Sequence, residues 1–423
     1  MKASRWFVLS LVSLALLGGV HARAARALTF TCEAVARSKV PDPAGAPFAN
    51  RFGNARLGGP QINAAGDIVF FARAKNAPRR LYLYPGAGAA SVLAEDGGAE
   101  PGGGVFTQFE SPSINDAGDV GFFGDLEEGE GVFIHEAGGT MVTVASTGDP
   151  VPGGGSVDQI AAVSRINSAG DLAFVATIAG GPPNGVFAYD ASTTSLTSVA
   201  REGDAALDGR RLCGFVAIGL GGSGAVVVQV STKLDCSDAA EQEQVGVYRQ
   251  TGGGMDRVAL AGDVTPIAGT TYANFYGPPD SNATDQVLFR ASASGIVGLF
   301  LFDPAAASTT KLVAIGDAAP LGGTAQTITH PGLTDAGRAG VRMRVKGDAA
   351  KHGIYLVGGT DEAVVRKTDP VPAGTLFIAP ASYVKIYEEV GVDRSGTRLT
   401  YSAKVRNGVQ PRGAVGLFRC SAL

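Results

Sequence analysis

The sequence predicts an all-β fold: a seven-bladed β-propeller with four antiparallel strands per blade, closed into a ring by N- and C-terminal strands within one blade. Three observations predict it. The 61 glycines are spread along all 423 residues, so turns are frequent throughout. A sequence unit recurs about every 52 residues. The last unit is one strand short, and a matching segment lies near the N-terminus.

The first 27 residues are typical of a secretory signal peptide. Lys2 and Arg5 precede an apolar run over residues 6–20, and the small residues around Ala27 predict cleavage after that position. A membrane anchor is the alternative, but the run is shorter than the ~20 residues that a spanning helix needs. We therefore expect a secreted or periplasmic protein whose residues 28–423 form a single propeller domain without a membrane span.

The charge of the mature chain argues against a nucleic-acid partner. Removing residues 1–27 takes away four of the 35 basic residues and none of the 39 acidic ones, so the formal charge moves from −4 to −8. Nucleic-acid binding depends on Lys and Arg contacts to phosphates, which an acidic chain disfavours.

Three copies of the repeat are plain. Each contains Ile-Asn, two further residues and a Gly-Asp pair, and they begin at Ile62, Ile114 and Ile166. Four weaker copies are centred on Gly224, Asp285, Gly337 and Gly396. Asn can bond its own backbone in a turn, and Gly adopts positive φ without strain, so this element predicts a tight turn that leads into a strand.

Each copy is followed by further short β-rich segments. In the second unit these are Gly131–Ile134 and then Val142–Ala145, which leads into the Gly148-Asp149 turn. A fourth segment, such as Val105–Glu110, leads into the next copy. Four strands in about 50 residues are typical of one propeller blade rather than one coil of a solenoid.

The two ends of the chain complete one blade. Residues 35–45 resemble residues 144–153, so we expect residues 375–423 to combine with residues 28–47. In that alignment Cys420 and Cys32 take the places of His135 and Met141, which flank a hairpin turn. Opposed hairpin positions lie near disulfide range, which predicts a Cys32–Cys420 bond. By elimination Cys213 pairs with Cys236, and free thiols are the alternative.

The repeats resemble those of a group of uncharacterised exported bacterial proteins with Gly-Asp-Pro-x-Pro-Gly-Gly units, best over residues 144–154 and 167–174. They are also similar to the periplasmic propeller repeats of TolB type, although the Trp-Ser-Pro-Asp-Gly opening of those repeats is absent. Both resemblances imply a propeller fold, and neither supplies a catalytic residue.

Local motifs predict no catalytic residue, no metal site and no cofactor. Ser223 lies in Gly-Gly-Ser-Gly-Ala, which we interpret as the fourth repeat turn rather than a nucleophile elbow. The repeated aspartates occur singly, so we expect them to cap turns instead of binding calcium. Asn282-Ala283-Thr284 fits a glycosylation acceptor only formally, because it coincides with a repeat turn.

Propeller geometry places any site on the innermost strands, at one mouth of the central channel. The candidate ligand-binding residues on those strands are Arg51, Gln108, Glu110, Asp158, Asn274, Tyr276 and His330, with Gln159 and Lys385 on the same strands. The leading hypothesis is an exported, monomeric, non-enzymatic binding or scaffold module for an unknown protein, peptide or carbohydrate.

The alternative is a lyase or hydrolase that acts on an extracellular polymer or lactone. It would use His330 or a channel carboxylate as the base. It requires His330 to meet two of Glu110, Asp158 and Arg51 at one mouth of the channel.

Overall fold

The computed structural model describes residues 30–45, 47–52, 59–74, 76–348, 350–372, 381–407 and 414–423. The predicted signal peptide, with its cleavage after Ala27, lies outside these residues. Within them every regular element is a β-strand. The described part of the chain contains no helix that is long and apolar enough to cross a membrane.

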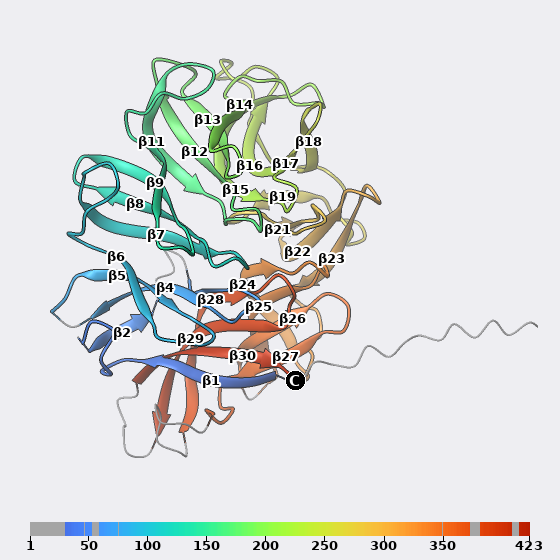
Figure 1. The fold of residues 1–423 in the computed structure, drawn as a ribbon. Coiled ribbons are helices and arrows are strands. Elements are labelled where there is room, and N and C mark those ends of the chain that lie inside the picture. Colours follow the sequence, from blue (N-terminus) through green and yellow to red (C-terminus); the bar gives the residue numbers. More distant parts are fainter. Residues whose placement is uncertain are drawn as a thin grey trace, which may run out of the picture.

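The strands form seven antiparallel sheets, the blades of a propeller (Figure 1). In chain order, blade 1 contains β2 (Phe48–Phe52), β3 (Gln61–Ile62), β4 (Ile68–Ala74), β5 (Arg79–Tyr84) and β6 (Ser91–Glu95). Blade 2 contains β7 (Phe106–Ile114), β8 (Val120–Leu126), β9 (Gly129–His135) and β10 (Met141–Ser146). Blade 3 contains β11 (Ser156–Val163), β12 (Leu172–Ala179), β13 (Asn184–Asp190) and β14 (Ser195–Arg201).

The second half of the chain continues this pattern. Blade 4 contains β15 (Arg211–Leu220), β16 (Val226–Lys233), β17 (Gln244–Thr251) and β18 (Gly254–Leu260). Blade 5 contains β19 (Tyr272–Phe275), β20 (Asp280–Ser281), β21 (Val287–Ala293), β22 (Ile296–Asp303) and β23 (Ser308–Ala314). Blade 6 contains β24 (Thr324–Leu333), β25 (Ala339–Lys346), β26 (His352–Val357) and β27 (Glu362–Arg366). Blade 7 contains β28 (Ala381–Val392), β29 (Arg398–Asn407), β30 (Ala414–Ala422) and β1 (Phe30–Arg37).

Period-two alternation explains why these strands assemble face to face. In β4, Ile68 and Phe70 pack in a cluster shared with blade 7, whereas Val69 and Phe71 pack in a cluster shared with blade 2. The described residues form seven such clusters, one between each pair of adjacent blades, including blades 7 and 1. The hydrophobic core is therefore a closed ring of interfaces.

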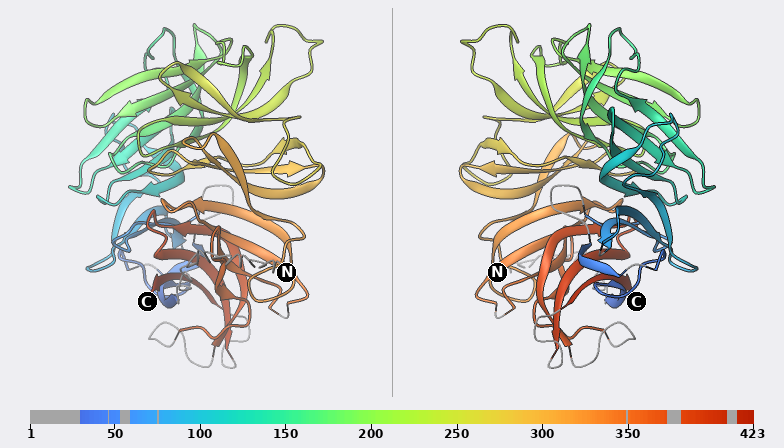
Figure 2. Two further views of the ribbon diagram at one scale, coloured as in Figure 1. Left: turned by 90° about the vertical axis from the view of Figure 1, so that its right-hand side faces the viewer. Right: turned by 90° about the vertical axis from the view of Figure 1, so that its left-hand side faces the viewer.

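The ring closes in blade 7, as the sequence predicts. Strand β1 pairs antiparallel with β30 and places Cys32 opposite Cys420, the register that Met141 and His135 have in blade 2. These two cysteines form a disulfide. In Figure 1 the blue strand β1 lies beside the red C-terminal strands, and in both views of Figure 2 the red blade lies between the orange and blue ones. The second predicted disulfide, Cys213–Cys236, is also present.

The segment after β1 is anchored in blade 1. The buried carboxylate of Asp42 accepts hydrogen bonds from Nη1 of Arg80 at 2.8 Å and from the hydroxyl of Tyr82 at 2.7 Å. The chain thus crosses from the closing strand into the first blade through a fixed polar contact, because a buried carboxylate requires such partners.

The repeat turns form a second ring, which we call the turn ring. Nδ2 of Asn63 donates to the carbonyl of Asn115 at 3.0 Å, and Asn115 repeats the contact to Asn167 at 3.1 Å. Nδ2 of Asn282 likewise donates to the carbonyl of Thr334 at 3.1 Å. Asn282 is fully buried, so its amide serves the turn and not a glycan. Where a turn lacks Asn, a backbone N–H takes the role, as Gly222 does towards Asn282.

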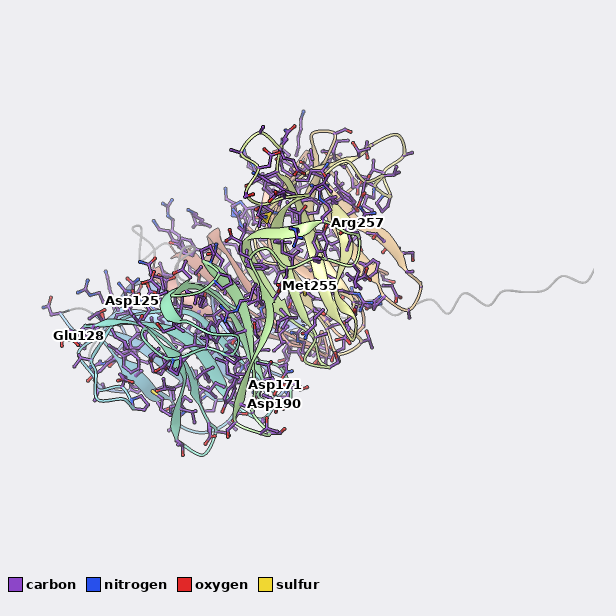
Figure 3. All side chains as sticks on the ribbon, turned by 90° about the horizontal axis from the view of Figure 1, so that it is seen from above. Asp125, Glu128, Asp171, Asp190, Met255 and Arg257 are labelled. Carbon is purple, nitrogen blue, oxygen red and sulfur yellow. A yellow bond between two sulfur atoms is a disulfide. The ribbon has the colours of Figure 1, made fainter. Side chains whose placement is uncertain are left out.

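The repeated aspartates cap these turns. Oδ2 of Asp67, Asp119 and Asp171 accepts from Nδ2 of the turn asparagine at 2.9, 2.9 and 3.0 Å. Their Oδ1 atoms accept a backbone N–H from the next hairpin of the same blade, as Asp171 does from Ala191 at 3.0 Å. Figure 3 shows Asp171 close to Asp190, at the end of that hairpin strand. The turn-capping interpretation is confirmed by these bonds.

Candidate ligand site in the central channel

A cavity of about 240 Å³ lies in the central channel, where the innermost strands approach the turn ring. All seven blades contribute to its wall. At about 30 Å³ per molecule of liquid water, its volume corresponds to about eight waters. Val163, Pro279 and Pro331 supply apolar surface, and a smaller set of polar groups faces them. This combination is typical of small-molecule sites.

A charged bridge crosses one side of this cavity. Nη1 of Arg165, which follows β11, lies 3.4 Å from Oδ2 of Asp280 in β20. Nη1 of Arg394, in the turn after β28, lies 3.5 Å from Oδ1 of the same carboxylate. The bridge therefore joins blades 3, 5 and 7. Arg165 and Arg394 both line a second, smaller hollow of about 40 Å³ on the side of the turn ring, and Arg394 does not line the larger cavity.

Backbone groups hold the central carboxylate in place. Oδ2 of Asp280 accepts from the N–H of Leu333 at 2.8 Å, and Oδ1 accepts from the N–H of Ser281 at 3.0 Å. Arg394 in turn donates to the carbonyl of Leu333 at 3.3 Å. Backbone N–H groups of blades 5 and 6 therefore hold Asp280 in place independently of the two arginines.

The electrostatics of the bridge favour the charged form of Asp280, whereas the net shift of the Arg165 pKa is downward. Burial raises the pKa of Asp280, but Arg165, Arg394 and the two backbone N–H groups outweigh burial, and the pKa lies below its usual value. Burial lowers the pKa of Arg165, Asp280 raises it, and Arg394 lowers it further. Arg165 keeps 30% of its side-chain surface exposed, and because it lines the cavity, that surface is available to a ligand.

The repeat explains how these residues come to face the channel. Each blade places one residue two positions before its turn residue, and across the blades these are Gln61, Ser113, Arg165, Gly219, Asp280, Gly332 and Gly391. A Cβ on Gly332 would lie 2.7 Å from Cγ1 of Val392 and 3.3 Å from Nη1 of Arg165. Glycine at this position in blade 6 therefore leaves room for both side chains.

A further arginine lies beside the cavity wall. The guanidinium of Arg290 lies over the ring of Tyr276, 5.5 Å from its centroid, and Nη1 donates to the carbonyl of Ile328 at 3.0 Å. Burial lowers the pKa of Arg290, and Tyr276 raises it. Both residues line the cavity. Tyr276 is thus a predicted ligand residue that the structure places in this wall.

Two other predicted residues, Gln108 and Glu110, lie together in β7, outside this cavity wall. Nε2 of Gln108 donates to Glu110 and to Asp125, both at 2.9 Å, while its Oε1 accepts from Arg79 at 2.9 Å. Burial and the nearby Asp125 raise the pKa of Glu110. Figure 3 shows Asp125 and Glu128 together on one side of the molecule.

The remaining predicted residues are spread over several blades. Asp158 in β11 accepts from Thr177 at 3.2 Å, and Asn274 is exposed in β19. Arg51 lies in β2 and His330 in β24, but their side chains lie outside the described residues. The role of this set stays a prediction.

Sequence reasoning missed Arg165, Asp280, Arg290 and Arg394. For Arg165 and Asp280 the signal was available only by comparing the position two residues before the turn in all seven repeats, where the other blades carry small or neutral residues. Arg290 and Arg394 do not lie at that position, so the comparison does not find them. No group of three or more His, Cys, Asp or Glu side chains among the described residues is arranged to hold a metal ion.

A sequence model of a family of unknown function, DUF7453, matches residues 31–205 and 127–421. No curated protein matches the sequence. Among solved structures, the β-propeller domain of the Trilobed protease from Pyrococcus furiosus, described as having an open velcro topology, is 11% identical with a TM-score of 0.50 and covers 85% of this chain and 93% of its own. It supports the propeller fold alone.

Two further structures are similar at lower scores. An oligogalacturonate lyase in complex with manganese is 13% identical over 94% of this chain and 98% of its own, with a TM-score of 0.49. TolB from Acinetobacter baumannii is 13% identical over 69% of this chain and 64% of its own, with a TM-score of 0.37.

Proposed function

The chain belongs to a family of unknown function, DUF7453, and we propose that it is an exported, monomeric, non-enzymatic binding protein that holds a small ligand in its channel cavity. The observation that carries the proposal is the convergence of Arg165 and Arg394 on Asp280 beside that cavity. Blades 3, 5 and 7 each supply one charged side chain to this bridge, although the three residues lie far apart in the sequence.

The rest of the fold supports a preformed site. The seven hydrophobic clusters between the blades and the turn ring hold the channel wall in place. The cavity is therefore already formed before a ligand binds. Two disulfides are typical of proteins outside the cytoplasm, which supports export. The lyase or hydrolase alternative would use His330 or a channel carboxylate as the base, and the side chain of His330 lies outside the described residues.

Filling the cavity tests the proposal. Val163→Trp places an indole in the wall, and Val264→Trp is the matched control because Val264 is 81% exposed and lies outside the cavity. Each variant and the wild type are screened by thermal shift against a library of small acids, sugars and peptides. We expect a compound that stabilises the wild type and Val264→Trp but not Val163→Trp.

Two outcomes contradict the proposal. One is a library in which no compound stabilises the wild type. The other is a compound that stabilises Val163→Trp as strongly as the wild type. If Val163→Trp does not fold, Gln61→Trp fills the cavity from blade 1 instead, and the same criterion applies.

A further inference from the structure

We infer that the channel ligand carries a carboxylate, which docks against Arg165 while its apolar part lies against the proline and tyrosine wall. Arg394 lines the adjoining smaller hollow and acts on the site through the carboxylate of Asp280 that it shares with Arg165. This inference rests on the proposed function and adds the chemical class of the ligand. It follows from the charge balance of the bridge, the geometry of its contacts and the apolar residues of the cavity wall.

The charge balance leaves one positive charge without a partner. Two guanidinium groups, Arg165 and Arg394, share one carboxylate, that of Asp280. Among the described residues, no second carboxylate forms an ion pair with either arginine. Arginine stays charged at neutral pH, and an excess charge in a partly buried wall is costly unless an opposite charge approaches it. A bound anion supplies that charge.

The contact geometry leaves donors available. Charge-assisted hydrogen bonds between guanidinium and carboxylate are usually ~2.7–2.9 Å long, whereas the two contacts to Asp280 are 3.4 and 3.5 Å. Asp280 already accepts two backbone N–H groups, from Ser281 and Leu333. It therefore positions the arginines without saturating their donors, since each guanidinium carries five N–H groups.

The apolar residues of the cavity wall favour an uncharged, apolar part of the ligand. Pro112, Pro279, Pro331 and Val390 present aliphatic surface, and Tyr276 adds an aromatic ring backed by Arg290. A volume equivalent to about eight waters fits a planar acid the size of benzoate. A carboxylate matches the planar guanidinium fork in a bidentate manner, which a neutral group of the same shape does not.

The test compares benzoate with benzamide, its neutral isostere, by isothermal titration calorimetry of the full mature chain in low salt. We expect benzoate to bind at least tenfold more tightly than benzamide to the wild type. Arg165→Met should remove most of that preference. Arg394→Met should weaken it less, because Arg394 acts on the site only through the shared carboxylate of Asp280. Arg344→Met, an exposed arginine of β25 outside the cavity wall, should keep it.

The outcomes separate this inference from the proposed function. If benzamide binds as tightly as benzoate and Val163→Trp abolishes both, a channel site stands and the carboxylate inference is wrong. If inorganic phosphate displaces benzoate at equal concentration, the site is a general anion site and the assignment to carboxylates is contradicted. If Arg165→Met does not fold, Arg165→Lys keeps the charge without the planar fork and should still lower the benzoate preference.

Discussion

Asn115 donates its Nδ2–H to the main-chain carbonyl of Asn167, 52 residues further along the chain, at a distance of 3.1 Å. Asn63 makes the same contact to Asn115. One side-chain amide thus connects each of these blades to the next. The repeat spacing in the sequence is the spacing of these inter-blade bonds.

Asn115→Ala is expected to lower the free energy of unfolding by about 1–3 kcal/mol, because it removes the inter-blade donor to the buried carbonyl of Asn167, which keeps only the N–H of Gly170, and removes the cap of its own turn. Urea unfolding measures the change. Asn274→Ala, at an exposed position of β19, should change stability by less than about 0.5 kcal/mol. Equal losses in the two variants would show that the turn ring contributes nothing specific.

The two disulfides should differ in their effect on stability. Cys32–Cys420 closes a sequence separation of 388 residues, and Cys213–Cys236 closes one of 23. In the chain-entropy account a longer loop gives more stabilisation, by about 2.5 kcal/mol for this difference. The double Cys→Ser variant of the first pair should therefore unfold at lower urea than that of the second pair. The reverse order would contradict a role of Cys32–Cys420 in holding the ring closed.

His352 is expected to make the protein less stable in acid. Burial, together with Arg342, Lys367, Lys385 and Arg344, lowers its pKa from 6.5 to about 4. The unfolded chain therefore binds a proton more readily than the folded one, and stability falls as the pH drops from about 7 to about 4. Its Nε2 also accepts from the N–H of Ile386 at 3.3 Å, which requires the neutral ring.

His352→Gln should flatten this part of the stability profile, as measured by urea unfolding at several pH values. His135→Gln, in β9, is the matched histidine variant and should keep the acid loss of the wild type. If the free energy of unfolding falls between pH 7 and 4 as much in His352→Gln as in the wild type, titratable groups other than His352 cause the loss.

Asp280→Asn tests the charged bridge. The variant leaves Arg165, in the cavity wall, and Arg394, in the adjoining hollow, without their shared carboxylate, so the free energy of unfolding should fall. Benzoate should then raise the melting temperature of Asp280→Asn more than that of the wild type, because the ligand carboxylate replaces the missing charge. The shift is read by differential scanning calorimetry with benzamide as the control. An equal shift in both proteins would show that the ligand does not contact this bridge.

The fold was largely predictable because its signals are local and periodic. The spacing of Ile62, Ile114 and Ile166 gives the blade length, and the opposed cysteines Cys32 and Cys420 give the closure. The weaker copies were also placed correctly: Gly224, Asp285, Gly337 and Gly396 all adopt positive φ. Asp285 adopts positive φ although it is not a glycine, so this copy keeps the turn conformation without the Gly of the other copies.

The channel cavity was not predictable in the same way. Whether Arg165 meets Asp280 depends on which blades face each other across the ring, and on glycines such as Gly332 that leave space between them. Bulges in the innermost strands, such as those between Ile160 and Ala162 in β11, change which side chains face the channel. Neither effect is visible in a strand's own alternation pattern. The candidates chosen from that pattern therefore included Tyr276 but omitted Arg165, Arg290 and Arg394.

A crystal structure of the mature protein soaked with benzoate tests the central claim most directly. We expect a carboxylate within hydrogen-bond distance of Arg165, with the ring between Tyr276 and Pro331. Benzoate bound elsewhere, with the cavity between these residues left to solvent, would contradict it.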